Sequence, residues 1–268
     1  MKNFSISKFI FWIGILFLYM PMVILIIYSF NESRLVTVWA GWSTKWYGEL
    51  LKDQQMMDAL KRSMQLAFMS ATSAAIFGML ASWVLVRIGR FKMKTVFSGM
   101  ITAPLVMPDV IIGLSLLLLF VSLSQSIGWP PERGMLTIWI AHTTFGMAYA
   151  TVVISSRLRE MDNSIEEAAQ DLGATPLKVF FLITLPLILP AIASAWLLAF
   201  TLSLDDVVIA SFVTGPGATT LPIEVLSSVR RGVSPKINAL ASLLILAVSL
   251  ITFVVWYMTR EKPKKAAV

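Results

Sequence analysis

Long uncharged runs, interrupted by short polar segments, dominate the sequence. Each run is long enough, at about 20 residues or more, to cross the hydrocarbon core of a bilayer as an α-helix. The uncharged runs are 9–30, 63–86, 110–131, 135–156, 179–204 and 237–259. With the apolar residues that flank them, they predict six spans at about 9–30, 64–86, 101–124, 135–155, 187–213 and 238–258. The fifth apolar region continues past Asp205 and Asp206 toward residue 223, which leaves its outer boundary open.

The composition supports an all-α integral membrane protein with a single transmembrane domain over residues 1–268. Hydrophobic residues make up 57% of the chain and charged residues 14%, whereas soluble domains carry about 25% charged residues. The first span exceeds the apolar core of a signal peptide and no small-x-small site follows it, so we expect it to be retained. The chain has no cysteine, and its lone histidine, His142, lies in an apolar run. We therefore expect a packed or pore-facing histidine and no metal site.

Basic residues predict the orientation of the chain in the membrane. The N-terminus, the loops after the second and fourth spans and the C-terminal tail carry thirteen Lys and Arg residues, against nine on the other side. The short loop after the second span contains Arg87, Arg90, Lys92 and Lys94 and no acid. The positive-inside rule then places both termini in the cytoplasm. The net charge of +7 is explained by this topology, so nucleic acid is not expected as a partner.

The polar segment between the fourth and fifth spans predicts a short helix in a cytoplasmic loop over 160–186. Ser164 can cap this helix with Glu167 three positions on, the spacing of a capping box. Glu166, Glu167 and Asp171 place negative charge in its first turns, where the helix dipole favours it. Gly173 fits the helix stop, with Pro176 just beyond. The expected helix covers 164–173, and a second helical piece begins at Leu177.

The same segment contains seven residues at a characteristic spacing. They are Glu167, Ala168, Ala169, Gly173, Ile183, Leu185 and Pro186. This spacing resembles the EAA loop of permease subunits in bacterial ABC importers. The resemblance implies a type I ABC importer permease fold, in which these seven residues form a cytoplasmic coupling helix and its continuation, docked on an ATPase subunit.

The resemblance also divides the chemistry between subunits. This chain would form the pathway, and a partner ATPase would bind ATP and Mg²⁺ and hydrolyse the nucleotide. The sequence agrees, because it contains no G-x-x-x-x-G-K-[ST] phosphate-binding loop. We therefore expect the chain itself to be neither an enzyme nor the holder of a cofactor.

Three acids lie in or beside apolar sequence: Asp109, Asp205 and Asp206. A carboxylate at the bilayer centre costs about 2.5–3.5 kcal/mol on insertion scales, so such residues usually face a cavity or a partner. We expect Asp109 and at least one of the adjacent pair to line the pathway and attract a cation. The alternative is that they cap helices or lie at the water interface. Trp196 and Phe200, four residues apart in the fifth span, join the candidates because cations also bind aromatic faces.

Further stretches resemble one subfamily over nearly the whole chain. They are Tyr28-Ser-Phe-Asn31, Ala103-Pro-Leu-Val-Met-Pro-Asp109, Leu202-Ser-Leu-Asp-Asp206, Ser211-Phe and Gly215-Pro-Gly. These are similar to the permeases of bacterial polyamine ABC importers, for putrescine and spermidine. The resemblance implies a heterodimer with a homologous permease, two cytoplasmic ATPase subunits and a periplasmic polyamine-binding protein. It implies alternating-access transport of putrescine or a related polyamine across the inner membrane.

Other functions remain open on the residues alone. An ABC importer permease for another cationic solute would carry the same EAA loop. A secondary transporter driven by an ion gradient would need no ATPase and would often contain inverted repeats, but no convincing internal repeat is present. A membrane enzyme lacks a recognisable motif. A purely structural membrane subunit would leave the EAA loop and the buried acids unexplained.

Overall fold

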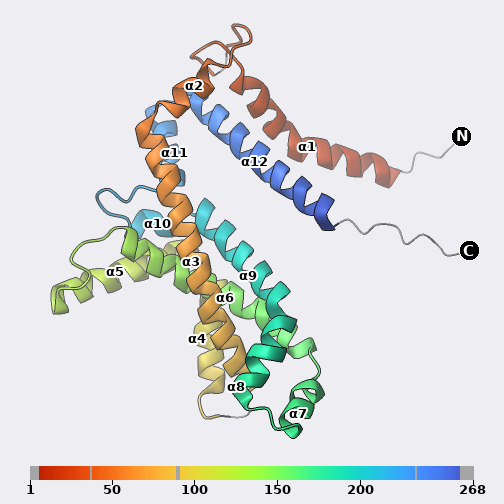
Figure 1. Ribbon diagram of the computed structural model, residues 1–268. Helices are drawn as coiled ribbons and strands as arrows, with labels where there is room; N and C mark the ends of the chain where they lie inside the picture. Colours follow the sequence, from red (N-terminus) through yellow and green to blue (C-terminus); the bar gives the residue numbers. More distant parts are fainter. Residues whose placement is uncertain (1–5, 37, 89–90, 233, 260–268) are drawn as a thin grey trace, which may run out of the picture. The chain divides into compact units, whose positions relative to one another are not determined.

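The computed structural model describes residues 6–36, 38–88, 91–232 and 234–259, and these residues are almost entirely helical (Figure 1). The elements are α1 (Ile6–Ser29), α2 (Lys45–Leu51), α3 (Gln54–Val86), α4 (Lys94–Val106), α5 (Asp109–Ile127), α6 (Met135–Glu160), α7 (Asn163–Asp171), α8 (Pro176–Val179), the π-helical turn η1 (Phe180–Thr184), α9 (Leu185–Asp205), α10 (Val208–Val213), α11 (Leu221–Arg231) and α12 (Pro235–Thr259). The chain forms two compact units, one of residues 1–57 with 225–268 and the other of residues 58–224.

The predicted spans correspond to long apolar helices. Among the described residues, five helical stretches have the length and composition to cross a membrane, and the apolar run Pro235–Leu250 at the start of α12 is a shorter sixth. The five are Ile6–Ser29, Gln54–Val86, Asp109–Ile127, Met135–Glu160 and Pro176–Asp205. The order of these helices along the chain therefore agrees with the six spans read from the sequence.

Two predicted spans are not single helices. The span predicted over 101–124 breaks at Met107, whose extended backbone (φ −78°, ψ 137°) separates α4 from α5. The reason is Pro108, which disfavours helical geometry in the residue before it; Pro104 stays inside α4. The span predicted over 187–213 ends at Asp205, because Asp206 is extended (φ −66°, ψ 126°) and the chain restarts as α10.

In the first unit, α1 and α12 lie against each other, and α12 also contacts α2 (Figure 1). The loop between α1 and α2 is organised by Asn31, whose carbonyl accepts a 2.7 Å hydrogen bond from the Trp46 indole. Lys236 at the start of α12 pairs with Asp53 just before α3, with 3.1 Å between Nζ and Oδ2. These polar contacts lie at one end of the helical pair, and the sequences of α1 and α12 are otherwise mostly apolar.

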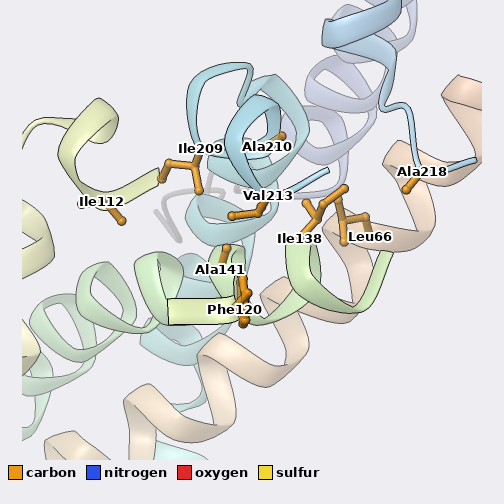
Figure 2. Close-up of a cluster of buried hydrophobic side chains, with 9 residues drawn as sticks. All are labelled: Leu66, Ile112, Phe120, Ile138, Ala141, Ile209, Ala210, Val213 and Ala218. Carbon is orange, nitrogen blue, oxygen red and sulfur yellow. The ribbon is translucent and has the colours of Figure 1, made fainter. Parts of the chain in front are cut away.

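The core of the second unit forms where α3, α5, α6 and α10 meet (Figure 2). Its buried side chains are Leu66, Ile112, Phe120, Ile138, Ala141, Ile209, Ala210, Val213 and Ala218. Close approach of α3 and α6 depends on a missing side chain, because a Cβ atom on Gly78 would lie 2.6 Å from the Cβ of Ala150. Small residues of α3, such as Gly78, Ala71 and Ala74, therefore let neighbouring helices pack closely within the chain.

We expect Gly78→Val to destabilise the second unit by about 1–3 kcal/mol, because an added side chain must displace the backbone of α6. Gly99→Val in α4 is the matched control, since no atom lies within 4 Å of the position of its added Cβ. The measurement is the fraction of purified protein that stays monodisperse after heating in detergent. Equal heat resistance of the two variants would contradict the close packing of α3 and α6.

Candidate functional site

The helix predicted over 164–173 is present as α7, but its cap differs from the prediction. Asp162, not Ser164, is the N-cap, and its carboxylate accepts a 2.9 Å hydrogen bond from the backbone N–H of Ser164. Hydrogen bonds from the backbone N–H and the hydroxyl of Ser164 hold the pKa of Asp162 below its ordinary value. A carboxylate at this position also favours the helix dipole. The Ser164 capping box is therefore wrong, because a better acceptor stands two residues earlier.

As predicted, α7 ends just before Gly173. Gly173 has φ +86°, a conformation that a residue with a side chain adopts at a cost. Its N–H donates to the carbonyl of Gln170 at 2.8 Å, and the N–H of Ala174 donates to the carbonyl of Ala169 at 3.0 Å. This pair of bonds is a Schellman motif, which satisfies the last carbonyls of the helix. Pro176 then begins α8, so the second helical piece starts about where it was expected.

The Ile-x-Leu-Pro end of the motif has a local structural effect. Pro186 has no N–H to donate to the carbonyl four residues earlier and would clash with it in a regular helix. The preceding turn, Phe180–Thr184, is widened into a π-turn between α8 and α9. This wide turn places Thr184 fully inside the protein. The three helical pieces continue as one stretch from Pro176 to Asp205.

A buried ion pair anchors α7, and sequence reasoning missed it. The Glu166 carboxylate lies 3.1 Å from Nε of Arg87 at the end of α3, and both side chains are only 11% exposed. Its Oε1 also accepts a 2.6 Å hydrogen bond from the hydroxyl of Thr184. Arg87 in turn donates to Oδ1 of Asn163 at 2.5 Å. Glu166, Arg87, Asn163 and Thr184, which we call the α7 anchor, therefore fix α7 to α3 and to the π-turn.

The anchor leaves the opposite side of α7 open. Glu167 and Ala168 are exposed, whereas Ala169 is partly buried. Two large apolar side chains lie beside them in the open, Ile165 at 44% exposure and Leu172 at 90%. Of the remaining motif residues, Ile183 and Leu185 are half-buried and Pro186 is exposed. Asp171, four residues after Glu167, is exposed as well. An exposed surface of apolar side chains beside carboxylates is typical of a docking site for another protein.

The three intramembrane acids have different surroundings. Asp206 is the most enclosed: its carboxylate accepts backbone N–H bonds from Ile209 at 3.2 Å and Ala210 at 2.7 Å, which caps α10. It also contacts Nε2 of His142 at 3.2 Å, and Nδ1 of that ring lies 2.7 Å from the Ser203 hydroxyl. His142 is buried, as expected from its apolar run. Capping, the alternative considered for these acids, thus accounts for Asp206.

Asp205 and Asp109 are exposed. Asp109 is the first residue of α5, where the helix dipole favours a carboxylate. One turn later, Gly113 packs against Ile209 and Phe212, so the starts of α5 and α10 belong to one region of the second unit. Asp205 is the last residue of α9, where the dipole disfavours a negative charge. Neither capping nor an ion pair within the described residues accounts for Asp205.

Trp196 and Phe200 share a face, as their spacing predicts. Their rings stack with centroids 5.2 Å apart and an angle of 17° between the planes. The Trp196 indole donates a 3.0 Å hydrogen bond to the hydroxyl of Thr72 in α3. Both rings pack against a small-residue cluster of Ala71, Ala74 and Ala199. Both residues are half-buried, and their packing supports the contact between α3 and α9.

Solved structures of low sequence identity share the fold of this chain. A bacterial alginate ABC transporter in complex with an alginate pentasaccharide-bound periplasmic protein aligns with a TM-score of 0.70 and 17% identity over 95% of this chain and 92% of that one. The MetNI methionine ABC transporter aligns with a TM-score of 0.62 and 17% identity over 76% of this chain and 94% of that one. The predicted fold class, a membrane permease of the type I ABC importer fold, is confirmed.

Sequence comparison then identifies the family. Residues 74–260 match the family described as the inner membrane component of binding-protein-dependent transport systems. The putrescine transport system permease protein PotI of Escherichia coli K12 is 67% identical over 94% of this chain and 90% of its own length. The spermidine/putrescine transport system permease protein PotC of the same strain is 40% identical over 92% of this chain and 91% of its own. The chain belongs to this family of multi-pass inner-membrane permeases, and it is not an ATPase.

We expect Glu166→Gln to loosen α7, because the change leaves the buried Arg87 charge without its partner; breaking such a pair costs about 3–5 kcal/mol. Backbone amides of α7 should exchange with deuterium about tenfold faster or more, as read by mass spectrometry. Glu160→Gln is the control: Glu160 pairs with Arg157 at 3.5 Å, but those side chains are 64% and 51% exposed. The same exchange rate in both variants would mean that the buried pair does not anchor the helix.

Proposed function

We propose that the chain is one permease subunit of an ATP-driven importer that moves putrescine, or a closely related polyamine, across the inner membrane by alternating access. The 67% identity to a putrescine permease over 94% of the chain is the main support for the substrate. Residues 1–268 act as a single permease domain with both termini in the cytoplasm. Its partners are a homologous permease, two ATPase subunits that bind ATP and Mg²⁺, and a periplasmic polyamine-binding protein.

The observation that supports the coupling role is the contrast between two adjacent glutamates. Glu166 faces inward and holds α7 to α3 and the π-turn. Glu167 faces outward among exposed apolar side chains. A helix held rigidly on one side and open on the other can transmit a push from an ATPase into α3 and α9. Glu167, Ala168, Ala169 and Gly173 form the contact in this proposal, with Ile183, Leu185 and Pro186 shaping the helix that carries the movement.

The pathway in this proposal is lined by Asp109 and Asp205, with Trp196 and Phe200 offering ring faces. Putrescine carries two ammonium groups, which suit exposed carboxylates in a poorly solvated channel. Asp205 is the strongest candidate, because it lies at the end of α9, where neither a cap nor an ion pair within the described residues stabilises its charge. Asp206 supports the site indirectly by capping α10 and holding His142.

Charge reversal on the exposed glutamate tests the coupling role. Glu167→Arg should reduce ATP-dependent putrescine uptake to about a tenth of wild type or less. The arginine would face the positive charges of the ATPase that Glu167 attracts in this proposal, and like charges at an interface cost several kcal/mol. The assay uses proteoliposomes that contain this chain, its partner permease and the ATPase, with binding protein added. Glu160→Arg, an equal charge change outside α7, should transport normally. Uptake that survives Glu167→Arg, or that needs no ATPase, would favour a secondary transporter.

Neutralising the acids one at a time tests the pathway. Asp205→Asn and Asp109→Asn should each raise the KM for putrescine by about tenfold, equal to roughly 1.4 kcal/mol of binding, with unchanged heat resistance. Asp206→Ala should instead lower heat resistance, because α10 loses its cap at a cost of about 0.5–2 kcal/mol. Unchanged affinity and rate in Asp109→Asn and Asp205→Asn would exclude these residues from the pathway. Competition by arginine or metal complexes, but not by polyamines, would indicate another cationic solute.

A further inference from the structure

A cavity of about 290 Å³ with a mixed apolar and polar lining lies in the second unit between the end of α3, α4 and the last turns of α6. Its polar lining includes Ser98 and Thr102 of α4 and Ser155, Ser156 and Arg159 of α6. Arg159 stands three residues before Asp162, the N-cap of α7, so the cavity is at the α7 end of α6. The coupling and pathway residues of the proposed function do not line it.

The cavity has the chemistry of an anion site. Its polar side chains are hydroxyls and one guanidinium, and no carboxylate lines it. The hydroxyls of Thr102 and Thr151 already donate to backbone carbonyls, so the donors considered for an anion are the serines and Arg159. Arg159 is exposed and makes no ion pair within the described part of the chain. A guanidinium presents donors in a planar fork that matches phosphate oxygens. The same positive charge would repel a polyamine, so this cavity is not part of the proposed cation pathway.

Ser155 supplies the second observation. It is only 7% exposed, and its hydroxyl has no hydrogen-bond partner among the described residues. A helical serine usually bonds the carbonyl four residues earlier, which here is that of Thr151. That carbonyl instead accepts a 2.9 Å hydrogen bond from the Ser82 hydroxyl of α3. An unsatisfied buried hydroxyl costs stability unless something binds it, and this one lines a cavity beside a guanidinium.

We propose that this cavity binds a phosphate group, supplied by the headgroup of an anionic phospholipid. Arg159 neutralises the phosphate, and the hydroxyls of Ser155, Ser156 and Ser98 donate hydrogen bonds to its oxygens. Basic pockets between membrane helices on the cytoplasmic side bind such headgroups. The apolar surroundings suit acyl chains, because Val152 lines the cavity at 47% exposure and Val96 and Met100 of α4 are 51% and 72% exposed. The lipid would then hold the segment that leads into α7.

Native mass spectrometry of the assembled importer, titrated with phosphatidylglycerol, tests the proposal. Wild type should retain the lipid with about tenfold higher affinity than Arg159→Gln, the loss expected for one charge-assisted hydrogen bond. Ser155→Ala should also weaken retention, and it should not impair folding because it removes only an unsatisfied hydroxyl. Arg157→Gln is the control: it removes the same charge two residues away, on a side chain paired with Glu160.

Two further arms separate the sources of the phosphate. Inorganic phosphate is titrated against lipid-free complex, and phosphatidylglycerol retention is repeated in its presence. Binding of inorganic phosphate that shows the same dependence on Arg159 and Ser155, without selective lipid retention, would keep the anion site and overturn the lipid assignment. Equal retention of phosphatidylglycerol by wild type, Arg159→Gln and Ser155→Ala would overturn the site altogether.

Discussion

In the hydrocarbon core of a bilayer, no water is available to backbone N–H and C=O groups, so each must find a partner inside the protein. This constraint explains why the described chain is mostly helical and why the backbone N–H groups at its helix breaks are satisfied by other groups. At the break after α9, Asp206 supplies its own carboxylate to the free N–H groups of α10. At the break before α5, Pro108 has no N–H to satisfy. The chain thus leaves helical geometry where a side chain satisfies the free N–H groups or where a proline has no N–H to satisfy.

The same constraint connects the membrane part to the coupling helix. Pro186 interrupts the regular hydrogen bonding of its helix, and the π-turn before it turns Thr184 toward Glu166. Glu166 also binds Arg87, so α7 is held by the end of α3 and by the start of α9. These two helices carry Thr72 and Trp196, which meet in a hydrogen bond further along. A displacement of α7 would therefore reach α9, which carries the candidate pathway residues Trp196, Phe200 and Asp205.

Several local features of the candidate site could be predicted from residue spacing. The motif from Glu167 to Pro186, the glycine stop at Gly173 and the shared face of Trp196 and Phe200 all depend on local geometry, which sequence distance determines. The cap of α7 was misassigned because both Asp162 and Ser164 are good capping residues. Adjacent helical residues point about 100° apart, so Glu166 and Glu167 have different surroundings, but their spacing does not say which of them faces the protein.

The sequence by itself determined that the chain is an α-helical membrane protein, where its apolar helices lie and which loop resembles a coupling segment, because bilayer thickness and helix period are properties of local composition. Only the tertiary structure decided that Arg87 and Thr184 meet Glu166, that His142 meets Asp206, and that Asp205 has no such partner in the described part of the chain. Those pairings join residues 79, 18 and 64 positions apart in the sequence. They depend on how α3, α6 and α9 pack, which no local pattern specifies.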